Sequence, residues 1–499
     1  MKFLIFLILS IVSGVFLGIY LPEQWRMLSL LSVLPISVSL LLPKKKIYAK
    51  IFGLSSTAED FTRGWLITGF TGSGKTSALT YLLFQIFKNA PNFGSVFLDQ
   101  KGVFWEIIER MAKHFGREED LVLVRTKPLN DPVSWKPKHT INLLGDNSIL
   151  ATSYAAFLTD TYSSLNSKGE GGNSAFFKSK GQEMMTLGIE ILRLLGDPVT
   201  IPRLERLLCD DDTQKEKLAQ LNRIVSTNLQ AAKTAKDFLS LKSLPPETFG
   251  GVIGNIGNIL KPFTAEAIAE IFCADEPTFS VTEIDQGKLV CISIPQSFIT
   301  QRIFINTLLK LFFYFHAQCR FDQSSEERAK HNQIFLCADE GQEIITSAFS
   351  AFADHRQAAI LREAKATIIL STQGYSSIYA ALSKEHADVL ISSLANQLIF
   401  QASSEENAKM AESFIGSRRI KEYSYSHGDS KTTKSVKWEI VPYIHFFKFR
   451  KFPKFYCVAK LANGRWKQGY LAPITPEGKI PKWLWSERFF LAIRSLLFR

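Results

Sequence analysis

The sequence predicts an α/β fold with a parallel, doubly wound sheet, an inserted all-α domain and an N-terminal apolar hairpin. Three observations lead to this prediction. Residues 3–20 and 27–42 are uncharged runs of the kind that enter a bilayer. Helical periodicity dominates residues 146–250. Elsewhere, helical patterns alternate with short apolar runs typical of buried strands, which lie at residues 65–68, 94–99, 288–294, 332–339, 366–371 and 396–401.

The composition leaves the class of partner open. The chain has 499 residues, of which 46% are hydrophobic, so there is enough apolar material for a large core. A formal net charge of +12 suggests nucleic acid or an anionic membrane as a partner and does not distinguish the two. The six cysteines are scattered and form no C-x-x-C pair. This pattern favours buried, reduced thiols over disulfides or a metal site.

Residues 1–46 are predicted to form a transmembrane helical hairpin. A cleaved signal peptide is the alternative, but no A-x-A-like site follows the first apolar run, and the second run would have no explanation. The lysines at 44–46 place the end of the hairpin in the cytoplasm by the positive-inside rule. Pro35 breaks the shorter second run, which leaves a tilted or re-entrant segment as an alternative to a full span.

A phosphate-binding motif follows the first predicted strand. The segment Gly69-Phe70-Thr71-Gly72-Ser73-Gly74-Lys75-Thr76 matches G-x-x-x-x-G-K-[ST], and a helical pattern follows it. Lys75 is expected to reach the β- and γ-phosphates of ATP, and the Thr76 hydroxyl is expected to bind Mg²⁺. An ordinary glycine-rich turn is the alternative, which the strand–loop–helix setting disfavours. The residues expected to bind the nucleotide are Gly69, Thr71, Gly72, Ser73, Gly74, Lys75 and Thr76.

Two acids end a later strand. The apolar run that begins at Gln333 closes with Asp339 and Glu340. Asp339 is expected to hold Mg²⁺ and Glu340 to polarise the attacking water, because hydrolysis needs both functions beside the phosphates. A simple helix start, with Asp339 as its N-cap, is the alternative. Together with Lys75, these acids predict a nucleoside triphosphatase, which must face the cytoplasm because ATP is there.

Two further polar residues are candidates for catalysis. Gln373 follows the strand at 366–371, where a polar side chain can sense the γ-phosphate. Arg362 precedes the same strand, and in a ring of subunits such an arginine can stabilise charge at a neighbour's nucleotide. For Arg362 the alternative is a surface salt bridge with a residue such as Glu363. The polar turn Asp99-Gln100-Lys101-Gly102 also ends a strand, at the edge where α/β sheets bind ligands, although composition alone favours a plain tight turn.

The C-terminal part is basic and aromatic. Residues 446–456 interleave rings with cations, a pattern that serves nucleic-acid binding but that we interpret as a half-buried strand. Residues 471–499 are predicted to be an amphipathic segment, with a helix from Trp483 that lies on a membrane or packs on the core.

These pieces, in this order, resemble the type IV secretion coupling proteins, the TraG/TraD-like conjugative DNA-transfer ATPases. The resemblance covers most of the chain. It rests on the N-terminal spans, the P-loop, Asp99–Gly102 (similar to the family's D-P-K-G), Asn142-Leu143, Phe176-Phe177, Ala338–Glu340, the stretch from Arg362 to Gln373, Asn396 with Phe400, Ala411 and Gly416.

The resemblance implies a RecA-like P-loop NTPase domain (residues 47–145 and 251–470) and an all-α insertion domain (146–250). It implies an ATPase in the cytoplasm, anchored to the bacterial inner membrane as part of a homo-hexamer. It also implies ATP, Mg²⁺, DNA without sequence preference, a relaxase or effector protein, and channel components as partners. Three departures are the short loop between the spans, Gln100 in place of proline, and the absence of an acidic tail in the sequence.

Two other classes of function remain as alternatives. The first is a related motor, either an FtsK-like DNA translocase or a secretion-assembly ATPase. The sequence shows no winged-helix domain like that of FtsK, and only 68 residues precede Gly69, where assembly ATPases carry a large domain. The second is a nucleotide-dependent receptor that docks protein effectors without moving DNA, which the basic charge disfavours.

Overall fold

The structure is a computed structural model that describes residues 46–127, 135–166, 174–346, 352–427, 432–482 and 484. Both predicted membrane spans lie outside these residues, as does all but residue 484 of the predicted C-terminal helix. Within the described ranges, no helix has the length and apolar character needed to cross a bilayer. The chain divides into two units, Met1–Ile47 and Tyr48–Arg499, and the site described below belongs to the second.

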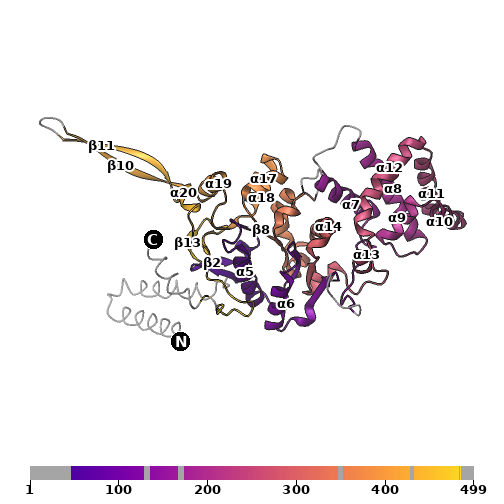
Figure 1. The fold of residues 1–499 in the computed structure, drawn as a ribbon, viewed down its shortest axis with the longest axis horizontal. Helices are drawn as coiled ribbons and strands as arrows, with labels where there is room; N and C mark the ends of the chain where they lie inside the picture. Colours follow the sequence, from indigo (N-terminus) through magenta and orange to yellow (C-terminus); the bar gives the residue numbers. More distant parts are fainter. Residues whose placement is uncertain are drawn as a thin grey trace, which may run out of the picture. The chain divides into compact units, whose positions relative to one another are not determined.

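A nine-stranded sheet organises the second unit, with the order β13-β12-β9-β3-β8-β7-β4-β6-β5. Figure 1 labels β8 and β13 within this sheet. The seven strands from β9 to β5 are parallel, and β12 and β13 add an antiparallel edge. The strands are β3 (Trp65–Thr68), β4 (Gly94–Asp99), β5 (Leu121–Arg125), β6 (Leu289–Ser293), β7 (Ile334–Asp339), β8 (Ala366–Thr372), β9 (Asn396–Ile399), β12 (Tyr456–Lys460) and β13 (Trp466–Tyr470). The predicted doubly wound parallel sheet is confirmed.

The central strands are apolar because the sheet is covered on both faces. In β3, Trp65 and Ile67 belong to one hydrophobic cluster, and Leu66 between them belongs to the other. The helices α5 (Lys75–Asn89) and α6 (Trp105–His114) cover the Trp65 face, whereas α14 (Ile299–Cys319), α17 (Tyr375–Ala381) and α18 (Lys384–Ser393) cover the Leu66 face. Because the strands from β9 to β5 are parallel, their carboxyl ends all lie at the same edge of the sheet.

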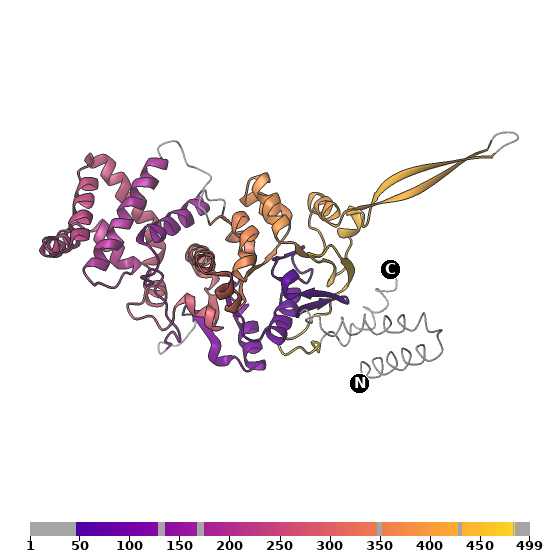
Figure 2. The same ribbon diagram turned by 180° about the vertical axis from the view of Figure 1, so that it is seen from behind.

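A group of helices is inserted between β5 and β6, and Figure 2 shows it in violet to rose. It contains α7 (Ala151–Asn166), α8 (Ser174–Leu194), α9 (Ile201–Cys209), α10 (Asp211–Ile224), α11 (Leu229–Lys242), α12 (Pro246–Leu260) and α13 (Glu266–Phe272). The chain enters and leaves it side by side, because Ile141 N–H donates to the Ile271 carbonyl over 2.7 Å. The boundary predicted after residue 250 lies inside α12, and helices continue to Phe272.

The region after β9 differs from the sequence prediction. After the helix α19 (Glu405–Ile415), β10 (Ser417–His427) and β11 (Thr432–Pro442) form a separate two-stranded ribbon. The strand predicted over residues 446–456 is wrong for most of its length, because α20 (Phe446–Phe449) occupies its start and β12 begins only at Tyr456. Phe449 and Phe452 are buried in the core and lie three residues apart, which is helical rather than strand spacing.

Candidate functional site

The loop Gly69–Thr76 joins β3 to α5 at the carboxyl edge of the sheet. Gly74, the residue before α5, has φ +118°, and a Cβ there would lie 2.7 Å from a ring carbon of Phe455. The loop is fastened by backbone hydrogen bonds, from Phe70 N–H to the Gln401 carbonyl (2.7 Å) and from Phe455 N–H to the Ser73 carbonyl (2.8 Å). The glycine is thus required by both backbone conformation and close packing.

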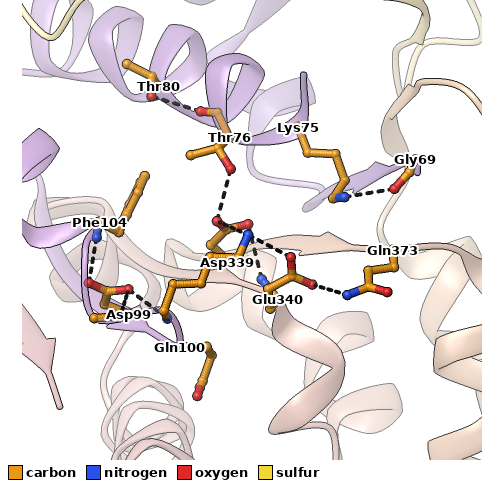
Figure 3. A network of polar contacts seen from close by, with 12 residues as sticks. Gly69, Lys75, Thr76, Thr80, Asp99, Gln100, Phe104, Asp339, Glu340 and Gln373 are labelled. Atoms are coloured by element: carbon orange, nitrogen blue, oxygen red, sulfur yellow. Dashed lines mark hydrogen bonds and ion pairs between the residues drawn. The ribbon is translucent and has the colours of Figure 1, made fainter. Parts of the chain in front are cut away.

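Lys75, the first residue of α5, is folded back onto this loop (Figure 3). Its Nζ donates to the carbonyl of Gly69 over 2.8 Å and to that of Phe70 over 3.3 Å. Burial lowers the pKa of the Lys75 ammonium, although the nearby Glu340 and Asp339 carboxylates act in the opposite direction. A cation is therefore held at the N-terminus of a helix, where an anion is favoured.

Asp339 lies at the end of β7, directly across from this helix. The Thr76 hydroxyl donates to Asp339 Oδ2 over 3.2 Å, and Figure 3 shows the two side chains facing each other. Parallel pairing explains the contact, since β7 and β8 are neighbours and β8 pairs with β3. The pair presents a hydroxyl and a carboxylate oxygen, the hard ligands that Mg²⁺ prefers.

Glu340, the next residue, is held in an unusual backbone conformation. Its φ of +53° and ψ of +44° lie in the left-handed region, which side-chain-bearing residues rarely adopt and which is concentrated at functional sites. Its Oε2 accepts hydrogen bonds from Gln342 Nε2 (2.7 Å) and Gln373 Nε2 (3.3 Å). Burial raises the pKa of Glu340, but Gln342, Lys101 and Lys75 together hold it below its ordinary value.

Lys101 brings a second cation to the two acids. Its Nζ lies 2.7 Å from Glu340 Oε1 and 3.4 Å from Asp339 Oδ2. Burial lowers the pKa of Lys101, but the carboxylates of Asp339 and Glu340 outweigh burial and raise it. The Lys101 side chain is 41% exposed, whereas those of Asp339 and Glu340 are 2% and 7% exposed. Lys101 therefore lies between the two buried acids and the solvent.

Asp99 fixes the turn that carries Lys101. Its carboxylate accepts four backbone N–H groups, those of Lys101 (3.0 Å), Gly102 (2.8 Å), Phe104 (2.6 Å) and Trp105 (3.2 Å). Burial raises the pKa of Asp99, and these four donors only partly offset the effect. The turn at 99–102 is therefore held in one conformation, which places Lys101 beside the two acids.

Comparison with protein families now places the chain. A model of the family described as "Type IV secretion-system coupling protein DNA-binding domain" matches residues 48–442. The chain belongs to this family of coupling proteins. The resemblance stated from the sequence is thereby confirmed.

The coupling-protein fold is also found among solved structures. An unbound form of the bacterial conjugative coupling protein TrwB is 13% identical, with a TM-score of 0.58 over 89% of this chain and 92% of that one. TrwB in complex with a non-hydrolysable ATP analogue has the same identity and TM-score over 87% and 91%. TrwB with ADP and Mg²⁺ has a TM-score of 0.54 at 13% identity, over 88% and 93%. A search of curated proteins finds no match.

In this coupling protein, one predicted site residue lies apart from the rest. Arg362 precedes β8, at the opposite edge of the sheet from the P-loop, and its Nη2 lies 3.0 Å from Glu59 Oε1. The side chains are 42% and 56% exposed. Within its own chain Arg362 is thus paired at the surface, with Glu59 rather than with the Glu363 considered from the sequence. Gln373, by contrast, joins the network at Glu340.

Sequence reasoning missed three contributors. Lys101 lies in the turn after β4, which was assigned no role from the sequence, because the pairing of β4 with β7 is visible only in the structure. Gln342 follows the two acids by only two residues and gave no signal of its own. Phe455 packs under Gly74 from a distant part of the sequence, which no local pattern indicates.

Proposed function

We propose that this coupling protein is a membrane-anchored ATPase that delivers DNA, as a relaxase-bound single strand, or a protein substrate to a type IV secretion channel. The observation that carries the proposal is the convergence of Lys75, the Thr76–Asp339 pair and Glu340 at one edge of the sheet. Family membership supports the cargo, since the matching domain is described as DNA-binding. The basic net charge of +12 fits a polyanionic cargo.

The residues of the loop fit ATP with Mg²⁺. Gly72 has φ +81°, and a Cβ built there would meet open space, so this part of the loop faces outward for a ligand. The Ser73 hydroxyl is buried and has no hydrogen-bond partner among the described residues. Thr76 and Asp339 would hold the metal, directly and through water, and the metal would neutralise phosphate charge. The complexes of TrwB with nucleotides support the same ligand here.

The other side chains divide the remaining work. Lys75 neutralises charge on the phosphates, and its burial strengthens that interaction. The lowered pKa of Glu340 keeps its carboxylate ionised at neutral pH, so that it can accept a proton from an attacking water at Oε1 or Oε2. Gln373 binds Glu340 Oε2 and can report on the state of the nucleotide through that hydrogen bond.

Location and assembly complete the proposal. Residues 1–46 anchor the chain in the bacterial inner membrane as a multi-pass hairpin, with the ATPase domain in the cytoplasm. The chain forms a hexamer in which Arg362 reaches the nucleotide of a neighbour, because its own P-loop lies at the other edge of the sheet. Relaxase or effector proteins and channel components are the proposed protein partners. The division into a RecA-like domain and an all-α insertion domain is part of this proposal.

One experiment tests the enzymatic part. The full chain, purified in detergent, is assayed for ATP hydrolysis with and without single-stranded DNA, beside Lys75→Ala. We expect hydrolysis that rises with DNA and is lost in the variant. A wild-type chain that shows no hydrolysis at any DNA concentration contradicts the proposal.

A further inference from the structure

The ribbon formed by β10 and β11 has no assigned role. Each strand has eleven residues, and they pair antiparallel from Ser417 opposite Pro442 to His427 opposite Thr432. The ribbon belongs to no larger sheet among the described residues (Figures 1 and 2). A two-stranded ribbon on its own is marginally stable in water, so a ribbon of this length indicates a surface that binds something.

The register separates the ribbon into two different faces. Directly opposed residues share a face, and neighbours along a strand alternate between faces. On one face Arg419 lies opposite Ile440, Lys421 opposite Trp438 and Tyr423 opposite Val436. Lys434 shares this face, because its Nζ lies 4.2 Å from the centre of the Tyr423 ring. We call these seven residues the ring face.

The ring face is cationic and exposes large apolar groups. Its described residues include three cations and no acid. Tyr423, Val436, Trp438 and Ile440 are 47%, 51%, 60% and 65% exposed. The opposite face is balanced, because Arg418 and Lys437 are accompanied there by Glu422 and Glu439. The ring face therefore carries net positive charge and the opposite face does not, which is the distribution that a polyanion bound to the ring face needs.

We propose that the ring face binds single-stranded DNA, with Tyr423 and Trp438 stacking on unpaired bases and Arg419, Lys421 and Lys434 contacting phosphates. This inference rests on the proposed function and names the part of the chain that holds its cargo. Stacking of bases on aromatic rings between cations is the general mode of sequence-independent single-strand binding. Alternate residues of a strand are about 6.8 Å apart, so cations and rings recur along the ribbon at a regular interval.

Two other partners fit the face less well. An anionic membrane attracts cations and tryptophan, but a hairpin that enters a bilayer needs an apolar tip. The strand residues at the end where His427 pairs with Thr432 run from Tyr425 to His427 and from Thr432 to Lys434, and they include no aliphatic side chain. Double-stranded DNA admits a β-ribbon in its major groove, but its bases are stacked on one another and offer no face to Trp438.

The test uses the full chain in detergent and fluorescence anisotropy of a labelled oligo-dT strand across a salt series. The double variant Tyr423→Ala/Trp438→Ala is expected to bind roughly ten-fold or more weakly. Lys421→Gln is expected to reduce the slope of log affinity against log salt by about 0.7, the value for one lost phosphate contact on a single strand. Lys437→Gln removes a cation from the opposite face of the ribbon and is the matched control, with expected wild-type affinity. Unchanged basal ATP hydrolysis in all three variants shows that they are folded.

The outcomes separate this inference from the proposed function. Wild-type affinity in the double variant, or equal losses in Lys421→Gln and Lys437→Gln, overturns the ring face as the binding surface and leaves the proposed function standing. A wild-type chain that binds no DNA at low salt overturns the DNA-coupling role itself. Weakened binding to vesicles with anionic lipid, alongside intact binding to oligo-dT, assigns the ring face to a membrane and contradicts the proposal. Equal loss of duplex and single-strand binding contradicts base stacking.

Discussion

Lys101 Nζ lies 2.7 Å from Glu340 Oε1 and joins two strands of the sheet at their carboxyl edge. The contact follows from topology, because β4 and β7 are parallel neighbours with Asp99 directly opposite Asp339. The turn after β4 therefore delivers its lysine to the acids that end β7. With Asp99 holding that turn through four N–H groups, Lys101 stays beside the two acids and helps to hold the pKa of Glu340 below its ordinary value.

Lys101→Met is expected to leave Asp339 and Glu340 without their shared cation. The two buried carboxylates then repel each other, which raises the pKa of Glu340 and lowers the free energy of unfolding at neutral pH by about 1–3 kcal/mol. Chemical unfolding of the nucleotide-free chain at pH 8 and pH 5 measures this effect, which should be smaller at pH 5 because one acid is then partly protonated. The exposed Lys113→Met, on α6, is the control, with an expected change within about 0.5 kcal/mol. Equal stability of the two variants at pH 8 would show that Lys101 does not support the acids.

Asp285 gives the clearest pH dependence. Burial raises its pKa, but His316 and Arg320 outweigh burial and lower it from 3.8 to about 2. His316 Nε2 lies 3.1 Å from Asp285 Oδ2. Because the folded-state pKa is depressed, this stabilisation is present above about pH 4 and is lost as the pH falls toward 2. It corresponds to about 2 kcal/mol at neutral pH.

Asp285→Asn is therefore expected to lower stability by about 2 kcal/mol at pH 6, with a difference from wild type that shrinks as the pH approaches 2. Thermal unfolding across this pH range measures it, and the exposed Asp322→Asn serves as the control. A difference that stays constant from pH 6 to pH 2 would mean that the ion cluster around Asp285 does not titrate as described.

Arg362 tests the proposed ring. Its salt bridge with Glu59 is exposed, so Arg362→Ala and Glu59→Ala are each expected to change stability by less than about 1 kcal/mol. Hydrolysis should differ sharply between them, with a loss of roughly 10³-fold for Arg362→Ala alone, as for arginines that act on a neighbour's phosphates. Mixing Arg362→Ala chains with Lys75→Ala chains should restore part of the activity. Equal hydrolysis by Arg362→Ala and Glu59→Ala would remove Arg362 from catalysis.

The sheet and the centre of the site were predictable from the sequence because buried parallel strands are continuous apolar runs. The apolar runs that form β3, β7 and β8 each end in a polar residue at the carboxyl edge of the sheet, and this change from apolar to polar can be read from the sequence. The helix α5, whose N-terminus forms part of the site, was also predictable from the glycine-rich loop before it and from its apolar stripe.

The ribbon and the segment at residues 446–456 were not predictable from the sequence, because neither contains a continuous apolar run typical of a buried strand. In β11 the apolar Val436, Trp438 and Ile440 alternate with charged residues, but the described side chains of the ribbon bury no face, so nothing in the sequence ties these strands to a core. At Phe446–Phe449, rings and cations alternate as in a strand, yet tertiary packing selects a helix that buries Phe449. The place of Lys101 depended on the strand order, which a single sequence does not state.

The most direct test of the whole account is hydrolysis by Glu340→Gln in the presence of single-stranded DNA. The substitution keeps the shape of the side chain and removes the charge that accepts a proton, so nucleotide binding should remain while DNA-stimulated hydrolysis falls by at least about 100-fold. Glu363→Gln, an exposed acid near the other edge of the sheet, should hydrolyse ATP like wild type. If Glu340→Gln binds ATP and still hydrolyses it at the wild-type rate, Glu340 is not the general base and the proposed site is wrong.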